Sequence, residues 1–314
     1  MIVFGPVPSR RLGQSLGINT IPPKICTYSC IYCQLGQTSS LRVHRSQFYP
    51  PENILKEARA RICNVHKNID FITIVPDGEP TLDKALGTLV DVLREFGIKI
   101  AVITNASLLW NPEVQEDLRR ADWVSVKIDA VTDKVWRAVN RPHPSLDIDT
   151  VLQGIRDFSK SYKGELTTET MLIKSINDSL PELEKIRDFI DSVTPSKSYI
   201  AMPTRPPAEP WATSPSEERI TAAYQVFSEK LGAVEYLIGY EGNEFAFTGN
   251  IREDLLGIMS VHPMQEEGVR ALLSRAGAHW DTVNDLLETG VLKEVVYRGK
   301  KFYMRTLPDA LHGQ

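Results

Sequence analysis

The stretch KICTYSCIYCQLGQT, residues 24–38, holds three of the chain's four cysteines within eight residues. Cys26 is followed after three residues by Cys30, and Cys30 after two by Cys33, so one tight loop can turn all three sulfurs toward a common centre. Four thiolates would fill the coordination of a zinc ion or a cubane iron–sulfur cluster. Three leave a metal position open for a substrate or cofactor, which is the feature that separates catalytic from structural zinc sites.

Other interpretations of the three cysteines are buried apolar thiols and a zinc site completed by a histidine. The sequence has no His-x-x-x-His pair and no second CxxC pair in support of zinc. So few cysteines in a cytoplasmic chain also make a disulfide framework improbable, because that compartment keeps thiols reduced. The fourth cysteine, Cys63, falls in a predicted helix, and we expect a core or surface thiol there instead of a fourth ligand.

Composition is that of an ordinary globular protein, with 42% hydrophobic and 24% charged residues among 314. No apolar run reaches about 18 residues, so we expect no membrane span, and the first residues lack the apolar core of a signal peptide. The cytoplasm is the expected location. The net charge of −4, with both signs interspersed, gives no field that would attract nucleic acid, so a nucleic-acid partner is possible but unsupported by charge.

Short apolar runs rich in Val and Ile alternate with longer segments of helical spacing. The strand candidates are Leu16–Ile21, Phe71–Val75, Ile98–Ile103, Trp123–Ile128, Leu166–Ile173, Ser198–Met202 and Val234–Ile238. The helix candidates are Pro51–Val65, Leu82–Phe96, Pro112–Arg120, Thr132–Val139, Asp147–Tyr162, Ser179–Ser192 and Ser216–Leu231. Such an α/β pattern predicts parallel strands in an open doubly wound sheet or in a full or partial barrel. Ligands then bind beyond the carboxyl ends of the strands.

The composition changes near residue 250, and we expect a first domain over residues 1–250 and a second over 251–314. The second reads as two or three short helices followed by the strands Leu292–Tyr297 and Lys301–Arg305, a pattern typical of a winged-helix module. Eight basic and nine acidic residues lie between 251 and 309. Because a DNA-binding module is usually more basic, we favour a docking or lid role.

The CxxxCxxC pattern after the first strand of a repeated β/α chain resembles the radical S-adenosylmethionine (SAM) superfamily. The resemblance implies a partial (β/α)6 barrel in which Cys26, Cys30 and Cys33 hold a [4Fe–4S] cluster, SAM chelates the fourth iron, and Tyr32 lies by the adenine. Reduction of the cluster, by an external electron donor of the flavodoxin or ferredoxin type, cleaves SAM to methionine and a 5′-deoxyadenosyl radical. That radical abstracts hydrogen from a substrate.

The segment FITIVPDGEPTL, residues 71–82, places a Gly-Glu-Pro at the end of the second predicted strand. By itself PDGEP is an ordinary turn signal. After the three cysteines it resembles the superfamily's glycine-rich motif for the SAM amino group, which implies that Gly78, Glu79 and Pro80 bind SAM. A glycine lets backbone approach a ligand, and a carbonyl or carboxylate accepts hydrogen bonds from an ammonium.

The third and fourth predicted strands also end in polar residues. Asn105, in TNASLL, is either a helix cap or Asx turn or a contact to SAM or substrate. In VSVKIDA, Lys127 and Asp129 share one face of the strand. Superfamily members often have a serine for the SAM ribose at the position of Lys127, so a lysine there indicates contact with the SAM carboxylate instead. Buried charges need partners, and Asp129 is the expected partner of Lys127.

The fifth and sixth predicted strands contribute one charged candidate each. Glu169, inside an otherwise apolar strand, is either a ligand contact or a residue at an exposed edge. Arg205 lies in the proline-rich segment AMPTRPPAEP, residues 201–210, and is either a preorganised fork for a carboxylate or phosphate or half of a structural salt bridge.

Two further motifs, FGPVPSRRLGQSLGIN (4–19) and VNRPH (139–143), together with GEPTL, TNASLL and RPPAE, resemble a group of Fe–S oxidoreductases related to the wyosine-base synthases that act on tRNA. Wyosine enzymes carry a second cysteine triad, which this chain lacks, so the resemblance does not imply condensation of pyruvate, although Lys127 or Lys174 could form an imine. Arginines and a histidine either form the mouth of an anionic-substrate site or pin an amino-terminal hairpin onto the barrel: Arg10, Arg11, Arg141 and His143.

The function that these observations predict is a radical SAM enzyme with an unidentified substrate, for which an RNA base and a peptide-like molecule are the candidates. The alternative is a non-catalytic Fe–S or zinc sensor that binds nucleic acid through the winged-helix module. Formation of 5′-deoxyadenosine from SAM distinguishes the two.

Overall fold

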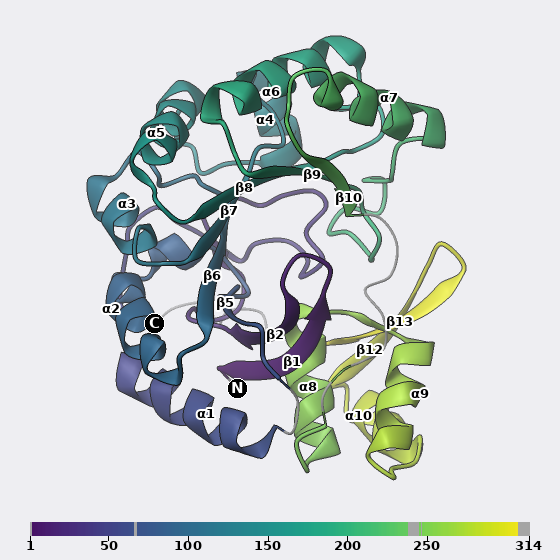
Figure 1. Cartoon of the computed structure of the whole chain (residues 1–314). Helices are drawn as coiled ribbons and strands as arrows, with labels where there is room; N and C mark the ends of the chain where they lie inside the picture. The colour runs from purple at the N-terminus through teal and green to yellow at the C-terminus, as the bar shows by residue number, and fades with distance from the viewer. Residues whose placement is uncertain (1, 66–67, 238–244, 246, 307–314) are drawn as a thin grey trace.

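The computed structural model describes residues 2–65, 68–237, 245 and 247–306. One curved sheet of eight strands dominates the molecule, in the order β1-β2-β5-β6-β7-β8-β9-β10 (Figure 1). The first two strands are antiparallel, and every later neighbour pair is parallel. The strands are β1 Val3–Ser9, β2 Gly13–Ile18, β5 Phe71–Ile74, β6 Lys99–Thr104, β7 Trp123–Lys127, β8 Glu165–Met171, β9 Lys197–Ala201 and β10 Val234–Leu237.

Helices cover the convex side of this sheet, as Figure 1 shows. They are α1 Pro51–Asn64, α2 Leu86–Leu93, α3 Pro112–Leu118, α4 Asp133–Asn140, α5 Ile148–Ser161, α6 Leu180–Val193 and α7 Glu217–Ser228. N-cap side chains fix where three of these helices begin. The side chains of Asn111, Asp147 and Ser216 accept hydrogen bonds from backbone N–H groups in the first turns of α3, α5 and α7. Each pair of neighbouring parallel strands is joined through one or two of these helices, which gives the sheet its helical outer layer.

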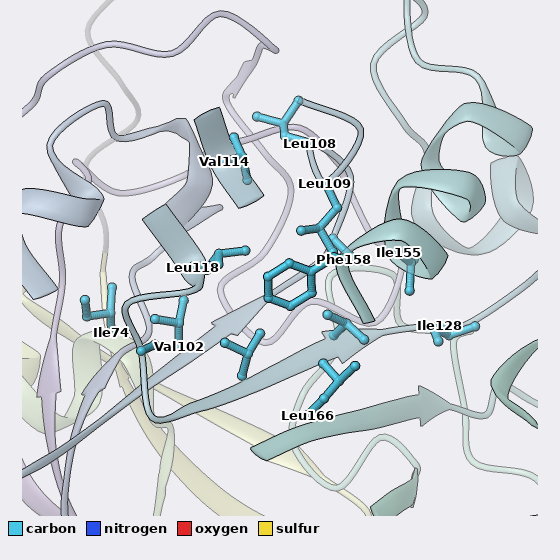
Figure 2. Packing of buried hydrophobic residues seen from close by; sticks show 14 of the residues in the cluster. Ile74, Val102, Leu108, Leu109, Val114, Leu118, Ile128, Ile155, Phe158 and Leu166 are labelled. Atoms are coloured by element: carbon cyan, nitrogen blue, oxygen red, sulfur yellow. The ribbon is translucent and has the colours of Figure 1, made fainter. Parts of the chain in front are cut away.

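The main core lies between the sheet and these helices. Outward-facing Val and Ile side chains of the parallel strands pack against one apolar face of each helix. Figure 2 shows Phe158 of α5, which is fully buried, among Leu109, Leu118 and Ile155. The alternate residues of the strands therefore face the concave side, where polar side chains occur.

The barrel does not close within the described residues, because β1 and β10 are the two edges of the sheet. The turn of the β1–β2 hairpin lies in the gap between them (Figure 1). Leu12, from this turn, packs against Trp123, Tyr199 and Leu237 on the concave side. The hairpin thus fills the lower part of the gap and carries Arg11 into the interior.

A smaller unit follows the barrel: α8 Ile251–Val261, β11 Met264–Gln265, α9 Glu266–Arg275, α10 Asp281–Glu288, β12 Leu292–Tyr297 and β13 Lys300–Arg305. Its three strands form a separate sheet in the order β11-β13-β12. Its core includes Phe4 and Val7 of β1 beside Leu255, Ile258 and Met259. The sequence predicted two or three short helices followed by two strands, and the described residues form three helices and both strands. The winged-helix interpretation and the domain boundary at 250 remain predictions.

The predicted partial barrel is confirmed, and the doubly wound sheet and the closed barrel are excluded for the described residues. Each predicted strand is present within a few residues, except that residue 238 lies outside the described ranges. One helix prediction was too long. The sequence predicted a helix over Leu82–Phe96, whereas Pro80–Leu82 form a 3₁₀ turn and α2 begins at Leu86 and ends at Leu93.

Three strand pairings escaped the sequence analysis: β1 with β2, β3 with β4, and β11 with β13. The predicted strands did not include β1, because Gly5, Pro6 and Pro8 interrupt its pattern, nor the two-residue strands β3 Ile25–Cys26 and β4 Ser40–Leu41.

Across the described residues, no helix has both the length and the apolar character that crossing a bilayer requires.

Candidate functional site

The three clustered cysteines line one cavity at the carboxyl ends of the parallel strands. The cavity has a volume of about 310 Å³, and Cys26, Cys30 and Cys33 share it with side chains that lie on or just after the carboxyl-terminal parts of β5, β6, β7, β8 and β9. Cys63 is exposed on α1 and does not belong to this lining. The arrangement separates the clustered thiols from the fourth, as the sequence predicted.

Gly78 allows the loop after β5 to pack against the cysteine loop. A Cβ atom at Gly78 would lie 1.8 Å from the carbonyl oxygen of Ile25. The backbone N–H of Glu79 donates to that same oxygen at 3.2 Å, and the N–H of Lys24 donates to the carbonyl of Asp77 at 2.8 Å. Because protein backbone already occupies the space beside its Cα, the glycine serves loop packing, whereas the sequence analysis assigned it to close approach of a ligand.

Burial raises the pKa of all three clustered thiols above its ordinary value. For Cys30 the pKa reaches about 12, chiefly through burial and then through the charge of Asp129; for Cys26 and Cys33 burial is again the first cause. Thiols of this kind are poor nucleophiles at neutral pH, since the thiolate is the reactive form. A bound metal deprotonates a coordinating thiol outright, so these side chains suit metal binding better than covalent catalysis.

No three His, Cys, Asp or Glu side chains in the described part of the chain are grouped as ligands of a single metal ion. Thiolates that bind a cluster are attached to different iron atoms and stand farther apart than the ligands of one ion.

Glu79 is buried among neutral donors. Its Oε1 accepts hydrogen bonds from the Thr81 N–H at 3.1 Å and from the hydroxyls of Thr81 and Thr104 at 2.6 and 2.5 Å. Its Oε2 accepts from the backbone N–H of Asn105 at 2.7 Å. Burial raises the pKa of Glu79 despite these four bonds. The carboxyl fastens the ends of β5 and β6 together, and Pro80 opens the 3₁₀ turn behind it.

Asp77 has a carboxylate oxygen with no partner among the described residues. Its Oδ2 accepts from the Asn19 amide at 2.7 Å, but Oδ1 is buried and accepts nothing, although the residue lines the cavity. Burial raises the pKa of Asp77 to about 7, against the opposing effect of the Asn19 hydrogen bond. An unsatisfied buried carboxylate oxygen is costly, and a ligand with an N–H group would remove that cost.

Glu169 accepts from two cations on the opposite wall. Lys127 and Glu169 are register partners on β7 and β8, and the lysine Nζ lies 2.5 Å from Oε1. Arg11, from the hairpin turn, donates to Oε2. Burial alone would raise the pKa of Glu169, but the charges of Lys127 and Arg11 outweigh it and lower the pKa to about 2. The predicted ion pair of Lys127 with Asp129 was wrong, because the strand register places Glu169 directly beside the lysine.

Asp129 lies behind the cavity lining, in a second network. It accepts from the Tyr32 hydroxyl, from the Asn140 amide at 2.8 Å and from the Met171 N–H at 2.8 Å. Burial raises its pKa, although Lys127 acts against the shift. Lys127 also lies over the ring of Tyr32, with its Nζ 5.4 Å from the centroid. Asp129 thus fixes the position of the aromatic ring and reaches the cysteine loop through Asn140.

Arg205 follows β9 and lines the cavity. It donates to the Gln34 side chain at 3.0 Å, in the loop just after Cys33, and its guanidinium lies 3.1 Å from the ring of His262. Of the other predicted mouth residues, Arg10 and Arg11 line the cavity, whereas Arg141 forms an ion pair with Glu209 at 2.5 Å and His143 pairs with Ser145 at 2.8 Å.

Most of the predicted site residues share the cavity lining, and two do not. The lining includes Tyr32, Gly78, Glu79, Asn105, Lys127, Glu169 and Arg205 with the three cysteines. Pro80 and Asp129 stand behind it. The sequence analysis missed Asp77, inside a motif it quoted, and Asn140, inside VNRPH. The sequence contained a signal for each. Asp77 is an acidic residue beside a glycine at a strand end, and Asn140 is a polar residue at the end of a helix.

Comparison with protein families matches residues 20–190 to the radical SAM superfamily. A UPF0026 protein of Methanocaldococcus jannaschii is 45% identical over 309 residues, which are 98% of this chain and 96% of that relative. A UPF0026 protein of Helicobacter pylori is 37% identical over 208 residues, 65% of this chain and 67% of the relative. The region matched to the superfamily contains the three cysteines, the Gly-Glu-Pro motif, Lys127 and Glu169.

Solved structures share the fold at low sequence identity. SuiB of Streptococcus suis bound to the precursor peptide SuiA has a TM-score of 0.53 at 14% identity, covering 71% of this chain and 49% of that one. TYW1 with a lysine-pyruvate adduct has a TM-score of 0.52 at 18% identity, covering 74% and 78%. The family match over residues 20–190, and not these structures, confirms the resemblance seen in the sequence: the chain belongs to the radical SAM superfamily.

Proposed function

We propose that this protein is a radical SAM enzyme that holds a [4Fe–4S] cluster on Cys26, Cys30 and Cys33, binds SAM beside it and abstracts hydrogen from an anionic substrate. The observation that carries the proposal is that the three clustered thiols, and no fourth cysteine, line one cavity in a barrel of this superfamily. A cluster with three protein ligands keeps one iron available to a ligand. When bound, the reduced cluster supplies the electron that cleaves SAM.

The amino-acid part of SAM carries one ammonium and one carboxylate, and the cavity offers a partner for each. Asp77 presents a carboxylate oxygen without a protein donor, whereas both oxygens of Glu79 are occupied. We therefore assign the amino group of SAM to Asp77, which would accept one of its N–H groups and leave the nitrogen lone pair for the open iron. Arg11 and Lys127 share the single charge of Glu169, so this group keeps a surplus positive charge for a carboxylate.

The charges of the whole cavity, including those assigned to SAM, favour an anionic substrate. Among the described residues that line it, five are cations and three are carboxylates: Arg10, Arg11, Lys24, Lys127 and Arg205 against Asp77, Glu79 and Glu169. This excess of positive charge supports a nucleotide more than a neutral peptide. Reduction requires an electron from outside the chain, and we propose a donor of the flavodoxin or ferredoxin type in the cytoplasm.

A lysine–pyruvate adduct like the one held by TYW1 is not supported at the two lysines considered for it. Burial alone would lower the pKa of Lys127, but Glu169 and Asp129 raise it, so the amine stays protonated and cannot attack a carbonyl. Lys174 is exposed and does not belong to the cavity lining. Pyruvate condensation is therefore not part of the proposed function.

The test is anaerobic reconstitution with iron and sulfide, followed by dithionite and SAM, with 5′-deoxyadenosine as the product measured. We expect the protein to form it, Cys30→Ala to lose both the cluster absorbance and the product, and Cys63→Ala to retain both. A cluster without any 5′-deoxyadenosine would favour the sensor interpretation. Loss of the cluster in Cys63→Ala would mean that the ligand set is wrong.

A further inference from the structure

We propose that the side-chain amides of Asn105 and Asn140 donate N–H···S hydrogen bonds to two of the three cluster thiolates and so raise the reduction potential of the cluster. The inference rests on the proposed function, because it requires the cluster. It assigns a role to the VNRPH motif, which the proposed function leaves unexplained, and to Asn105, whose sequence interpretation stayed open between a turn and a SAM contact.

Asn140 is the last residue of α4 and is buried. Its Nδ2 lies 3.4 Å from the sulfur of Cys30 and 2.8 Å from Oδ2 of Asp129. A carboxylate only accepts hydrogen bonds, so the amide nitrogen, and not its oxygen, must face Asp129. One N–H is committed to the carboxylate, and the second is therefore free to bond the sulfur.

Asn105 follows β6 and has the same arrangement on the other side of the cysteine loop. Its Nδ2 lies 3.6 Å from the sulfur of Cys26 and 2.8 Å from the hydroxyl of Thr27. Its Oδ1 accepts from the backbone N–H of Ser107 at 3.0 Å, which fixes the orientation of the amide, because a backbone N–H can only donate. Both amides are thus held by one firm hydrogen bond and give the other N–H to a sulfur.

The backbone around Asn140 holds the cysteine loop in place for this contact. The N–H of Ile31 donates to the carbonyl of Val139 at 3.0 Å, and the N–H of Ser29 donates to the carbonyl of Asn140 at 3.0 Å. The N–H of His143 donates back to the carbonyl of Thr27 at 2.9 Å. Residues 139–143 therefore run along residues 27–31, and the left-handed conformation of Arg141, with φ of 45°, turns the chain from helix α4 into this pairing.

Reduction adds negative charge that is shared with the thiolate sulfurs, and an N–H dipole pointing at a sulfur stabilises that charge. Hydrogen bonds to the sulfurs are among the features that set the potential of an iron–sulfur cluster. Removing either donor should make reduction harder. The two amides serve different sulfurs through separate anchors, so their effects should be nearly additive.

The main experiment measures the midpoint potential of the reconstituted cluster by a redox titration followed by electron paramagnetic resonance, without SAM. For Asn140→Ala we expect reduction to become about tenfold less favourable, a shift of about 59 mV to more negative potential for a one-electron couple. Tyr32→Phe is the matched control, because it also removes one donor from Asp129 but no donor from a sulfur. An unchanged potential in Asn140→Ala, or an equal shift in Tyr32→Phe, overturns the proposal.

A second measurement keeps the test valid if Asn140→Ala does not retain a cluster. Asn105→Ala should shift the potential in the same direction. In the wild-type protein labelled with ¹⁵N-asparagine, pulsed electron paramagnetic resonance of the reduced cluster should detect weak nitrogen couplings from side-chain amides. If an intact cluster shows no such coupling, the inference is wrong while the proposed function stands. If no [4Fe–4S] cluster forms in the wild-type protein, the proposed function itself fails.

Discussion

The two walls of the cavity satisfy a buried glutamate in opposite ways. On the β5–β6 side, Glu79 receives only neutral hydroxyl and backbone donors. On the β7–β8 side, Glu169 receives the cations of Lys127 and Arg11. Burial therefore raises the pKa of the first carboxyl, whereas in the second the two cations outweigh burial and lower it.

This difference indicates that the two walls have different roles in the site. The neutral wall fixes geometry, because Glu79 ties the strand ends to Asn105, which in turn contacts the cysteine loop. The ionic wall supplies electrostatic potential, because two cations that share one carboxylate remain attractive to a further anion. A residue type alone does not tell these roles apart; its hydrogen-bond donors do.

The largest expected effect is on the ionic wall. Glu169→Ala leaves two cations without their carboxylate, and Arg11 and Lys127 are only 16% and 22% exposed. Removing one partner of a buried charge pair costs about 3–5 kcal/mol. We expect that loss in the free energy of unfolding, measured by urea denaturation of the apoprotein.

The control is the triple variant Arg11→Met, Lys127→Met, Glu169→Leu, which removes the charges together. It should recover most of the lost stability, because apolar residues of similar volume can replace a buried ionic group. A single Glu169→Ala variant as stable as the wild type would show that water, and not the protein, surrounds this group.

The second effect is a pH dependence with opposite signs on the two walls. The pKa of Glu169 falls from 4.5 to about 2, so its contribution is present above its unfolded pKa and is lost as the pH falls toward 2. At 1.36 kcal/mol per pKa unit this amounts to roughly 3 kcal/mol. Glu79 has a pKa raised above 4.5, so its contribution is present below that unfolded value and is lost as the pH rises through the folded pKa.

The free energies of unfolding of the wild type, Glu169→Gln and Glu79→Gln are compared from about pH 2.5 to about pH 7.5. The difference between each variant and the wild type measures the contribution of that glutamate. The stability gap for Glu169→Gln should narrow at low pH. The gap for Glu79→Gln should widen at low pH. If the free energies of unfolding of both variants stayed parallel to that of the wild type across this pH range, the proposed difference between the two walls would be wrong.

The third effect concerns the neutral wall at a fixed neutral pH. In Glu79→Gln, one amide oxygen can still accept from Thr81 and Thr104, but the amide nitrogen then faces the N–H of Asn105. A buried donor without an acceptor costs about 1–3 kcal/mol, so we expect about 2 kcal/mol. Thermal unfolding measures the loss, and added salt should leave it unchanged. A strong salt dependence would indicate that charged groups, and not the neutral donors found among the described residues, dominate the surroundings of Glu79.

The smallest effect tests the ammonium partner between the two walls. Asp77→Asn should weaken SAM binding to the reconstituted protein by about tenfold, or about 1.4 kcal/mol. Binding of 5′-methylthioadenosine, which has no amino-acid part, should not change. Wild-type affinity for SAM should rise with pH through about 7, the pKa of Asp77, since the carboxylate is the accepting form. Equal weakening for both ligands would indicate a distorted loop instead of a lost ammonium contact.

Local patterns in the sequence were sufficient for the barrel and for much of the site. The cysteine spacing and the residues that end β5 to β9 are short-range features, and parallel strands bring such ends to one edge. The same argument predicts that Lys127 and Glu169 lie toward the same edge of the sheet, but not that they are in contact. The register of β7 and β8, which makes them direct neighbours, is a property of the folded sheet.

Contacts between distant segments could not be predicted in this way. Arg11 and Glu169 are 158 residues apart, and Asn140 and Cys30 are 110 apart. Arg11 reaches the cavity because the hairpin turn fills the gap of an incomplete barrel, and β1 itself was hidden by its glycine and prolines. Gly78 was identified correctly as a residue needing space, but only the structure shows that backbone of the cysteine loop fills that space.

The measurement that tests the central claim most directly is electron–nuclear double resonance on the dithionite-reduced protein with SAM labelled with ¹⁵N in its amino group. Our account predicts a direct nitrogen coupling to the cluster, because three cysteines leave one iron for that group. Zinc in the anaerobically purified protein, or a cluster with no coupling to bound SAM because all of its irons already have protein ligands, would contradict it.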